Sequence, residues 1–238
     1  MAAQLELPDV ETIFDTHSED YEGTTNRSIG FSGLKVDFFI RAKANHLLQE
    51  LANLYGNTST LSLLDIGCGV GKYHALIKDH VGSVEGVEVS SDSLAIARRA
   101  NPDVGYTHYD GRRLPYADAS FDVAYTVCVM HHVPPRHWEK FAREMMRVLK
   151  PGGSAFVFEH NPLNPLTRKA VNDCPYDADA VLLRPREVKE LFEAAGAEKY
   201  RNAYILSVPA AGGVLKKIDG LFSKIPTGAQ YCAQFQRA

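Results

Sequence analysis

Apolar and polar residues along the middle of the chain follow two alternating patterns. Short apolar runs predict buried strands, and longer stretches with an apolar residue at every third or fourth position predict amphipathic helices. The predicted strands are 61–65, 83–88, 104–109, 123–127, 154–159, 200–208 and 229–236. The clearest helical stretches are 34–54, 72–80, 135–150 and one that begins at Pro185. Such alternation predicts an α/β fold, in which a parallel sheet carries helices on both faces.

The first predicted strand ends in Asp65, and three glycines follow at every second position, Gly67, Gly69 and Gly71. Glycines let the backbone come close to a ligand, and N–H groups at the start of the next helix can bind its polar atoms. Lys72 stands where the dinucleotide fingerprint G-x-G-x-x-G has its last glycine, which disfavours a nicotinamide oxidoreductase. An ordinary strand-to-helix turn is the alternative.

The second predicted strand ends in Glu88, about twenty residues after the glycines, where a ribose-binding acid belongs in such folds. A carboxylate accepts hydrogen bonds from both ribose hydroxyls. Glu85 is a weaker rival because it lies inside the strand. Two later motifs follow in order, Asp110-Gly111 and Lys150-Pro151-Gly152-Gly153. Asp-Gly is also a strong turn dipeptide, so Asp110 could cap a turn instead of binding a ligand.

Together these motifs extend from residue 61 to about 159, and they resemble class I S-adenosylmethionine-dependent methyltransferases. The resemblance implies a Rossmann-like, seven-stranded, mostly parallel sheet whose last strand is antiparallel. It also implies S-adenosylmethionine as cofactor, with Glu88 on its ribose and Asp110 on its adenine. The remaining cofactor-binding residues that it implies are Asp65, Gly67, Cys68, Gly69, Gly71, Val89, Gly111 and Val127.

The segments outside the cofactor-binding half are predicted to complete one domain, 1–238. Residues 1–60 resemble the family's N-terminal helical cap, in which an aromatic residue can close over the cofactor. We predict Tyr21 as this lid and as a substrate-lining residue, with packing in the interior as the alternative. Residues 161–183 and 209–226 are predicted to be insertions on the substrate side. Asn161 begins the first of them, and its two Asn-Pro pairs predict a rigid, non-helical segment lining the acceptor pocket. The second has helical spacing, which fits a packed helix, a lipid-facing helix or a dimer contact.

Three histidines follow predicted strands on the ligand side of the sheet: His131, His132 and His160. If the acceptor atom is a hydroxyl, a base would take its proton, and histidine suits that role near neutral pH. We therefore predict His131 and His160 as catalytic residues and His132 as a substrate-lining residue, with a structural role as the alternative. His131, His132 and His137 could compose a metal site, but ligands at recurrent spacing are lacking, and the sequence predicts no metal.

Composition narrows the setting of this chemistry. The net charge of −3 over 238 residues argues against a general nucleic-acid binder. The sequence has no apolar run of bilayer length and no recognisable signal peptide, so we expect no integral membrane segment. Its four cysteines are scattered, which predicts reduced thiols in a cytoplasmic protein.

The predicted function is methyl transfer from S-adenosylmethionine to a small-molecule acceptor. The acceptor classes are a sugar, a lipid or a secondary metabolite, and its O, N or C atom could receive the methyl group. A homodimer is one option for the assembly. The alternative function is an S-adenosylmethionine-binding protein without methyltransferase activity, acting as a regulator or scaffold.

Overall fold

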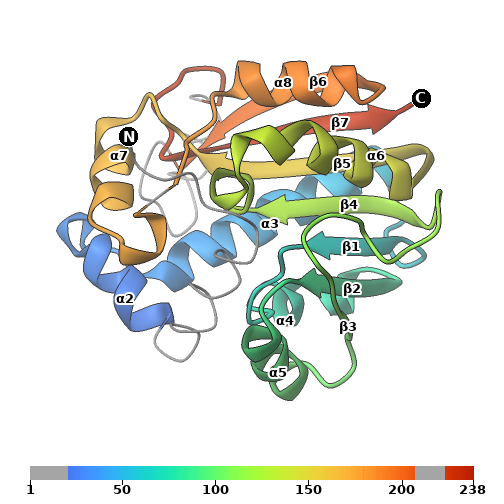
Figure 1. Ribbon diagram of the computed structural model, residues 1–238, viewed down its shortest axis with the longest axis horizontal. Coiled ribbons are helices and arrows are strands. Elements are labelled where there is room, and N and C mark those ends of the chain that lie inside the picture. The colour runs from blue at the N-terminus through green and yellow to red at the C-terminus, as the bar shows by residue number, and fades with distance from the viewer. Residues whose placement is uncertain (1–20, 179, 207–222) are drawn as a thin grey trace.

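The protein was examined as a computed structural model that describes residues 21–178, 180–206 and 223–238. Seven strands form one sheet in the order β3-β2-β1-β4-β5-β7-β6 (Figure 1). The strands are β1 (Ser62–Ile66), β2 (Ser83–Glu88), β3 (Gly105–His108), β4 (Phe121–Val127), β5 (Leu149–His160), β6 (Ala197–Ile205) and β7 (Gln230–Arg237). β7 runs antiparallel to both neighbours, whereas the other neighbouring pairs are parallel. The predicted fold class is confirmed.

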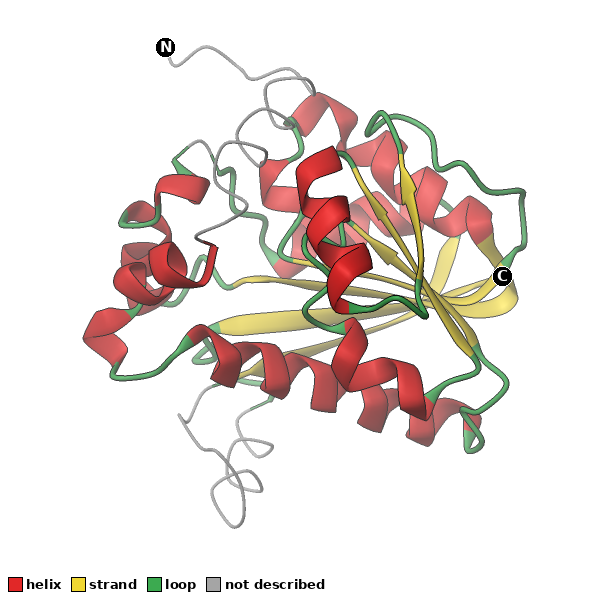
Figure 2. Cartoon of the chain, turned by 90° about the horizontal axis from the view of Figure 1, so that it is seen from below, coloured by secondary structure: helices red, strands yellow, loops and turns green. Residues whose placement is uncertain are grey.

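Helices cover both faces of this sheet (Figure 2). The α-helices are α2 (Tyr21–Ser28), α3 (Val36–Tyr55), α4 (His74–Ile77), α5 (Ser91–Ala100), α6 (Trp138–Val148), α7 (Pro165–Asn172) and α8 (Pro185–Ala194). Short 3-10 helices are η2 (Gly30–Ser32), η3 (Lys78–His80), η4 (Met130–His132), η5 (Pro135–His137) and η6 (Pro175–Asp177).

Alternate residues of each central strand belong to two separate hydrophobic cores. Leu63 packs in the core beneath α3, with Leu47 and Leu51. Leu64 faces the opposite core, beneath α6 and α8, with Met145 and Phe192. Strands buried on both faces explain why the sequence shows continuous apolar runs instead of a simple alternation.

Several predicted elements differ from the structure. β5 begins at Leu149 and contains residues 150–153, although the strand was predicted to begin at 154. The predicted helix 72–80 is only one α-helical turn, α4, followed by η3, because Gly71 has a φ of +72° and the chain turns once more before His74. The segment after β5 was predicted to be non-helical, which is wrong for α7. Asn164 caps this helix by accepting from the N–H groups of Leu166 and Thr167, and Pro165 occupies the first helical position.

The predicted N-terminal cap divides into two parts within the described residues. From Ala44 onward α3 packs on the sheet, whereas its residues up to Lys43, together with α2 and η2, line the two cavities. The side chain of Tyr21 and residues 1–20 lie outside what the structure describes, as do residues 209–222 of the predicted 209–226 insertion. None of the described helices is long and apolar enough to cross a bilayer.

Candidate active site

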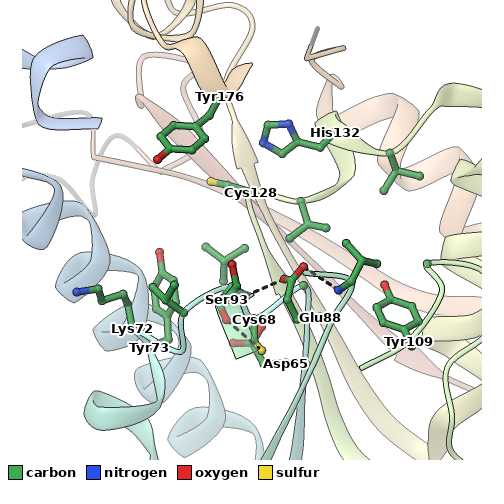
Figure 3. A pocket seen from close by; sticks show the side chains of 18 of the residues that line it. Asp65, Cys68, Lys72, Tyr73, Glu88, Ser93, Tyr109, Cys128, His132 and Tyr176 are labelled. Carbon is green, nitrogen blue, oxygen red and sulfur yellow. Dashed lines mark hydrogen bonds between the residues drawn. The ribbon is translucent and has the colours of Figure 1, made fainter. Parts of the chain in front are cut away.

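Two cavities adjoin at the edge of the sheet where β1, β2, β4 and β5 end. The first cavity lies over the glycine loop, and the second is bounded by α2, η2, the start of α3, α7 and η6. The second is larger, with about 1750 Å³ of open space against about 1150 Å³. Five residues line both cavities: Tyr73, Val127, Cys128, His132 and Tyr176. Figure 3 places Glu88, Cys68 and Asp65 on one side of the first cavity, opposite Cys128, His132 and Tyr176.

The three loop glycines have positive φ angles, +75° at Gly67, +52° at Gly69 and +72° at Gly71, but different surroundings. A Cβ atom on Gly67 would lie 2.6 Å from Val129, and one on Gly71 would lie 2.6 Å from the hydroxyl of Tyr106. A Cβ atom on Gly69 would meet no atom of the described residues within 4 Å. Of the three loop glycines, only Gly69 therefore combines a glycine conformation with open space in the first cavity.

Glu88 fixes the glycine loop through its carboxylate. Oε2 accepts from the N–H of Gly69 at 2.9 Å, and Oε1 accepts from the N–H groups of Val89 at 2.7 Å and Ser90 at 3.0 Å. Burial raises the pKa of Glu88, although these three N–H donors oppose that shift. The side chain lines the first cavity, whereas its rival Glu85 does not, and the contact of Glu88 with a ribose stays a prediction.

Asp65 lines the first cavity, but its carboxylate also contacts the interior of the protein. Oδ2 lies 3.0 Å from Nε2 of His74, whose Nδ1 lies 2.6 Å from the hydroxyl of Tyr106. Asn101 completes this support by donating to the carbonyl of Gly71. No pattern in the sequence indicated His74, Tyr106 and Asn101, because they belong to separate elements and form no local motif.

Eight of the ten predicted cofactor-binding residues line the first cavity: Asp65, Gly67, Cys68, Gly69, Glu88, Val89, Gly111 and Val127. Gly71 does not, because it packs against Tyr106 and Asn101 behind the loop. Asp110 does not line it either. Its exposed carboxylate accepts from the N–H groups of Arg112 and Arg113, and these donors outweigh desolvation and lower the pKa of Asp110. It thus caps a turn, and its contact with adenine stays a prediction.

Further residues line the first cavity without having been predicted: Ile40, Val70, Lys72, Tyr73, Ser93, Tyr109, Val129, Val133 and Tyr176. Tyr73 and Tyr109 directly follow or precede predicted motifs, and this adjacency was the one sequence signal that could have identified them. Ile40 and Tyr176 come from segments far away in the chain, so no local pattern pointed to them.

The second cavity has apolar walls and a polar floor. Its apolar residues are Ile29, Phe31, Leu34, Val36, Phe38, Phe39, Leu166, Ala170 and Val171, together with Val127, Leu206 and Ala229. Phe31 and Leu166 are 46% and 60% exposed, which is unusual for large apolar side chains beside a cavity. The polar floor contains Lys43, Cys128, His131, His132, His160, Asp177 and Gln230. The cavity therefore suits a molecule with an apolar body and a polar group.

All three predicted histidines reach this floor. His131 is buried, and its Nδ1 lies 2.5 Å from Oε2 of Glu159, whose Oε1 accepts from the N–H groups of Val129 and Met130. Burial disfavours a charged ring, but Glu159 and Asp177 outweigh it and raise the pKa of His131 well above its usual value. Burial and the neighbouring His131 lower the pKa of His132 to about 3.

Asn161 has a different place from the one predicted. It is fully buried, and its side-chain amide donates to the carbonyls of Pro226 and Gly228 while its oxygen accepts from the N–H of Leu163. These bonds engage both ends of the amide, so Asn161 holds the loop after β5 and does not line either cavity.

Cys128 lies at the junction of the two cavities. We expect a large fraction of its side chain to be a thiolate near neutral pH. Burial alone would raise its pKa, but Lys43, with Nζ 3.7 Å from the sulfur, and His160 lower the pKa of Cys128 to about 7. The thiolate is the reactive form of cysteine. We expect the rate of alkylation by iodoacetamide, followed by mass spectrometry, to be half-maximal near pH 7 at Cys128.

Lys43→Met should raise the pKa of Cys128 and slow its alkylation at pH 7, because the substitution removes the cation beside the thiolate. The exposed Lys35, at the start of the same helix, provides the control, and Lys35→Met should leave the rate unchanged. Burial raises the pKa of Cys68, Cys174 and Cys232, so these thiols should stay unmodified. An equal rate in Lys43→Met would contradict this account of the junction.

A Rossmann-like sheet with a glycine loop held at its ligand edge is typical of proteins that bind nucleosides. Comparison with known proteins identifies which of these proteins the chain resembles. Residues 64–157 match the family model described as a methyltransferase domain. The cofactor-binding half of the chain, which these residues span, is thus a methyltransferase domain of the class I S-adenosylmethionine-dependent type. It is similar to the sterol 4-C-methyltransferase of Caenorhabditis elegans, with 27% identity over 54% of this chain and 39% of that protein.

A second relative is the 2-methyl-6-phytyl-1,4-hydroquinone methyltransferase of Synechocystis, with 33% identity over 52% of this chain and 40% of that protein. The chain thus spans about two fifths of the length of these curated relatives. A solved methyltransferase structure from Thermotoga maritima, titled a possible histamine N-methyltransferase, aligns with a TM-score of 0.67 at 21% identity, over 96% of this chain and 100% of that one. That similarity demonstrates a shared fold.

Proposed function

We propose that this protein transfers the methyl group of S-adenosylmethionine to a small molecule that has an apolar body. The observation that carries the proposal is the open face of Gly69, which lies in a cavity that joins a second, larger one through Cys128. One cavity suits the cofactor, and the other suits the acceptor.

The residues of the first cavity fit the cofactor. Backbone at Gly67 and Gly69 comes close to the open space, where the amino-acid end of the cofactor would lie beside Asp65. Glu88 would bind the ribose, and Val89, Tyr109 and Gly111 would surround the base. The bound cofactor supplies an electrophilic methyl group on a positively charged sulfur. The protein must then hold the acceptor atom in line with that methyl group and exclude water.

Both predicted catalytic histidines line the second cavity. His160 is the better candidate for taking a proton from the acceptor, because Glu159 and Asp177 raise the pKa of His131 and favour its protonated ring. Glu159 orients the ring of His131. A base is needed only where the accepting atom carries a proton that it must lose, as a hydroxyl does. The nature of the accepting atom, oxygen, nitrogen or carbon, therefore decides whether these histidines act on it.

Among the acceptor classes predicted from the sequence, the apolar walls of the second cavity favour a lipid. Two relatives whose names specify a sterol and a phytyl-hydroquinone substrate support the same choice. We also propose a cytoplasmic location, because none of the four cysteines forms a disulfide. The homodimer and the absence of nucleic-acid partners stay predictions.

Methyl transfer can be measured with isotope-labelled S-adenosylmethionine and a panel of sterols, prenylated hydroquinones and sugar nucleotides. We expect label in an acceptor with an apolar tail. Ala170→Trp narrows the second cavity from α7, so it should raise the KM for that acceptor while the affinity for S-adenosylhomocysteine stays unchanged. Arg168→Trp, an exposed position on the same helix, is the matched control. Tight cofactor binding without transfer to any panel member would favour a non-enzymatic binding protein.

A further inference from the structure

We propose that His131, His132 and Asp177 form a binding site for a divalent first-row transition-metal ion on the floor of the second cavity. This proposal goes beyond the methyl transfer proposed above and does not depend on it. One ligand atom from each side chain lies within 4.8 Å of the others. The sequence predicted no metal, and the only combination considered there was His131, His132 and His137. In the structure Asp177 of η6, and not His137, joins the two histidines.

The spacing of the three side chains fits ligands that share one metal ion. Oδ1 of Asp177 lies 3.4 Å from Nε2 of His131 and 3.4 Å from Nε2 of His132. Two atoms that each lie about 2.0–2.2 Å from one ion in a tetrahedral or octahedral site are roughly 3–3.5 Å apart. Direct hydrogen bonds would be shorter, with heavy atoms about 2.7–3.2 Å apart. The observed separations thus match ligands that share an ion better than groups bonded to one another.

Nε2 of His131 supplies the second, independent observation. The His131 side chain is 1% exposed, and this atom has no hydrogen-bond partner among the described residues. A buried polar atom without a partner is costly and needs a physical explanation. An ion held between the two histidines and Asp177 would satisfy this atom.

The surroundings of His131 are those of a supported metal ligand. Nδ1 of its ring faces Oε2 of Glu159 at 2.5 Å, and Glu159 is itself held by two backbone N–H groups. A carboxylate on one ring nitrogen fixes the tautomer and directs the lone pair of the other nitrogen to the ion. The backbone also joins the two halves of the site, because the N–H of Val181 donates to the carbonyl of His131 at 2.8 Å.

The ligand set selects the kind of ion. Two imidazoles and one carboxylate suit Zn²⁺, Co²⁺ or Fe²⁺, whereas Mg²⁺ and Ca²⁺ prefer oxygen ligands. Three protein ligands leave at least one coordination position for another molecule. All three side chains line the second cavity, so that position is available to water or to an oxygen of a bound molecule. The alternative is a doubly protonated His131 held between Glu159 and Asp177 without an ion.

The experiment titrates tag-free, full-length protein, stripped with a chelator, with Co²⁺ and Zn²⁺ by calorimetry and follows the visible absorption of Co²⁺. We expect one ion per chain. His132→Ala and Asp177→Ala should each weaken binding by at least about 100-fold, and Glu159→Gln by about 10- to 100-fold through the lost support. His137→Ala is the control and should bind as the wild type does.

Circular dichroism and thermal unfolding of each variant, measured without metal, report whether it is folded. If Asp177→Ala fails this check, His132→Ala and the wild-type Co²⁺ spectrum decide the question. Folded wild-type protein that binds no Co²⁺ would overturn the site, as would unchanged affinity in folded His132→Ala. Either result would leave the proposed methyl transfer untouched, because that function is tested by cofactor binding and turnover.

Discussion

Gly69→Val is expected to weaken the binding of S-adenosylhomocysteine by at least about 100-fold, or roughly 3 kcal/mol. A Cβ atom at this position would meet no atom of the described residues within 4 Å, so the valine side chain would occupy space in the first cavity, where the cofactor would lie. Calorimetry measures the affinity, and thermal unfolding measures what the substitution costs the fold. That cost should be about 1–2 kcal/mol, because valine must adopt a positive φ.

Gly196→Val is the matched control for this strain. Gly196, just after α8, has a φ of +86° and equally open surroundings, but it lies outside both cavities. It should lose similar stability and keep its affinity for S-adenosylhomocysteine. Gly71→Val should instead destabilise the fold, since its side chain would collide with Tyr106, Asn101 and Ala97. A folded Gly69→Val variant with wild-type affinity would remove the assignment of this loop to the cofactor.

Glu88→Ala is expected to weaken cofactor binding by about 1–3 kcal/mol, the range for lost hydrogen bonds to a charged group. The structure gives two reasons. The variant loses the carboxylate proposed to bind the ribose hydroxyls, and it leaves the N–H of Gly69 without its 2.9 Å acceptor, which loosens the loop. Glu85→Ala is the control on the same strand, because Glu85 is half-buried and does not line the cavity.

The two reasons can be separated with a 2′-deoxy analogue of S-adenosylhomocysteine. If Glu88 binds the ribose, the analogue should bind the wild type more weakly than the parent compound does, and Glu88→Ala should bind both about equally. If Glu88 acts only through the loop, Glu88→Ala should weaken both ligands by the same factor. Equal affinity of wild type and Glu88→Ala for S-adenosylhomocysteine would place the ribose elsewhere.

The ligand-binding edge could be predicted because it depends on local patterns. Apolar runs identified the strands, and each parallel strand delivers its last residues to the same edge of the sheet. Glu88 and Gly69 meet there because β1 and β2 are neighbours in the sheet and in the chain, with Asp65 paired to Gly86. Sequence spacing was sufficient for such residues.

Other predictions about the site failed or remained open because they depended on what surrounds a residue. Gly71 and Gly69 look alike in sequence, yet one packs against Tyr106 and the other faces a cavity. Asn161 was predicted to line a pocket, but its side-chain amide instead donates to the carbonyls of Pro226 and Gly228, which lie far away in the chain. Asp177 carries no signal of its own, and only the fold of the segment after β5 brings it to His131.

By itself, the sequence determined the α/β class, the seven strands apart from their ends, and the glycine loop with its acid, since periodicity and turn chemistry act over a few residues. Only the tertiary structure decided which glycine faces open space, how the histidines meet Asp177, and that the acceptor side is a separate, largely apolar cavity. The second cavity arises where α2 and α7 come together from distant parts of the chain (Figure 1), and side-chain contacts across such distances leave no periodic trace in the sequence.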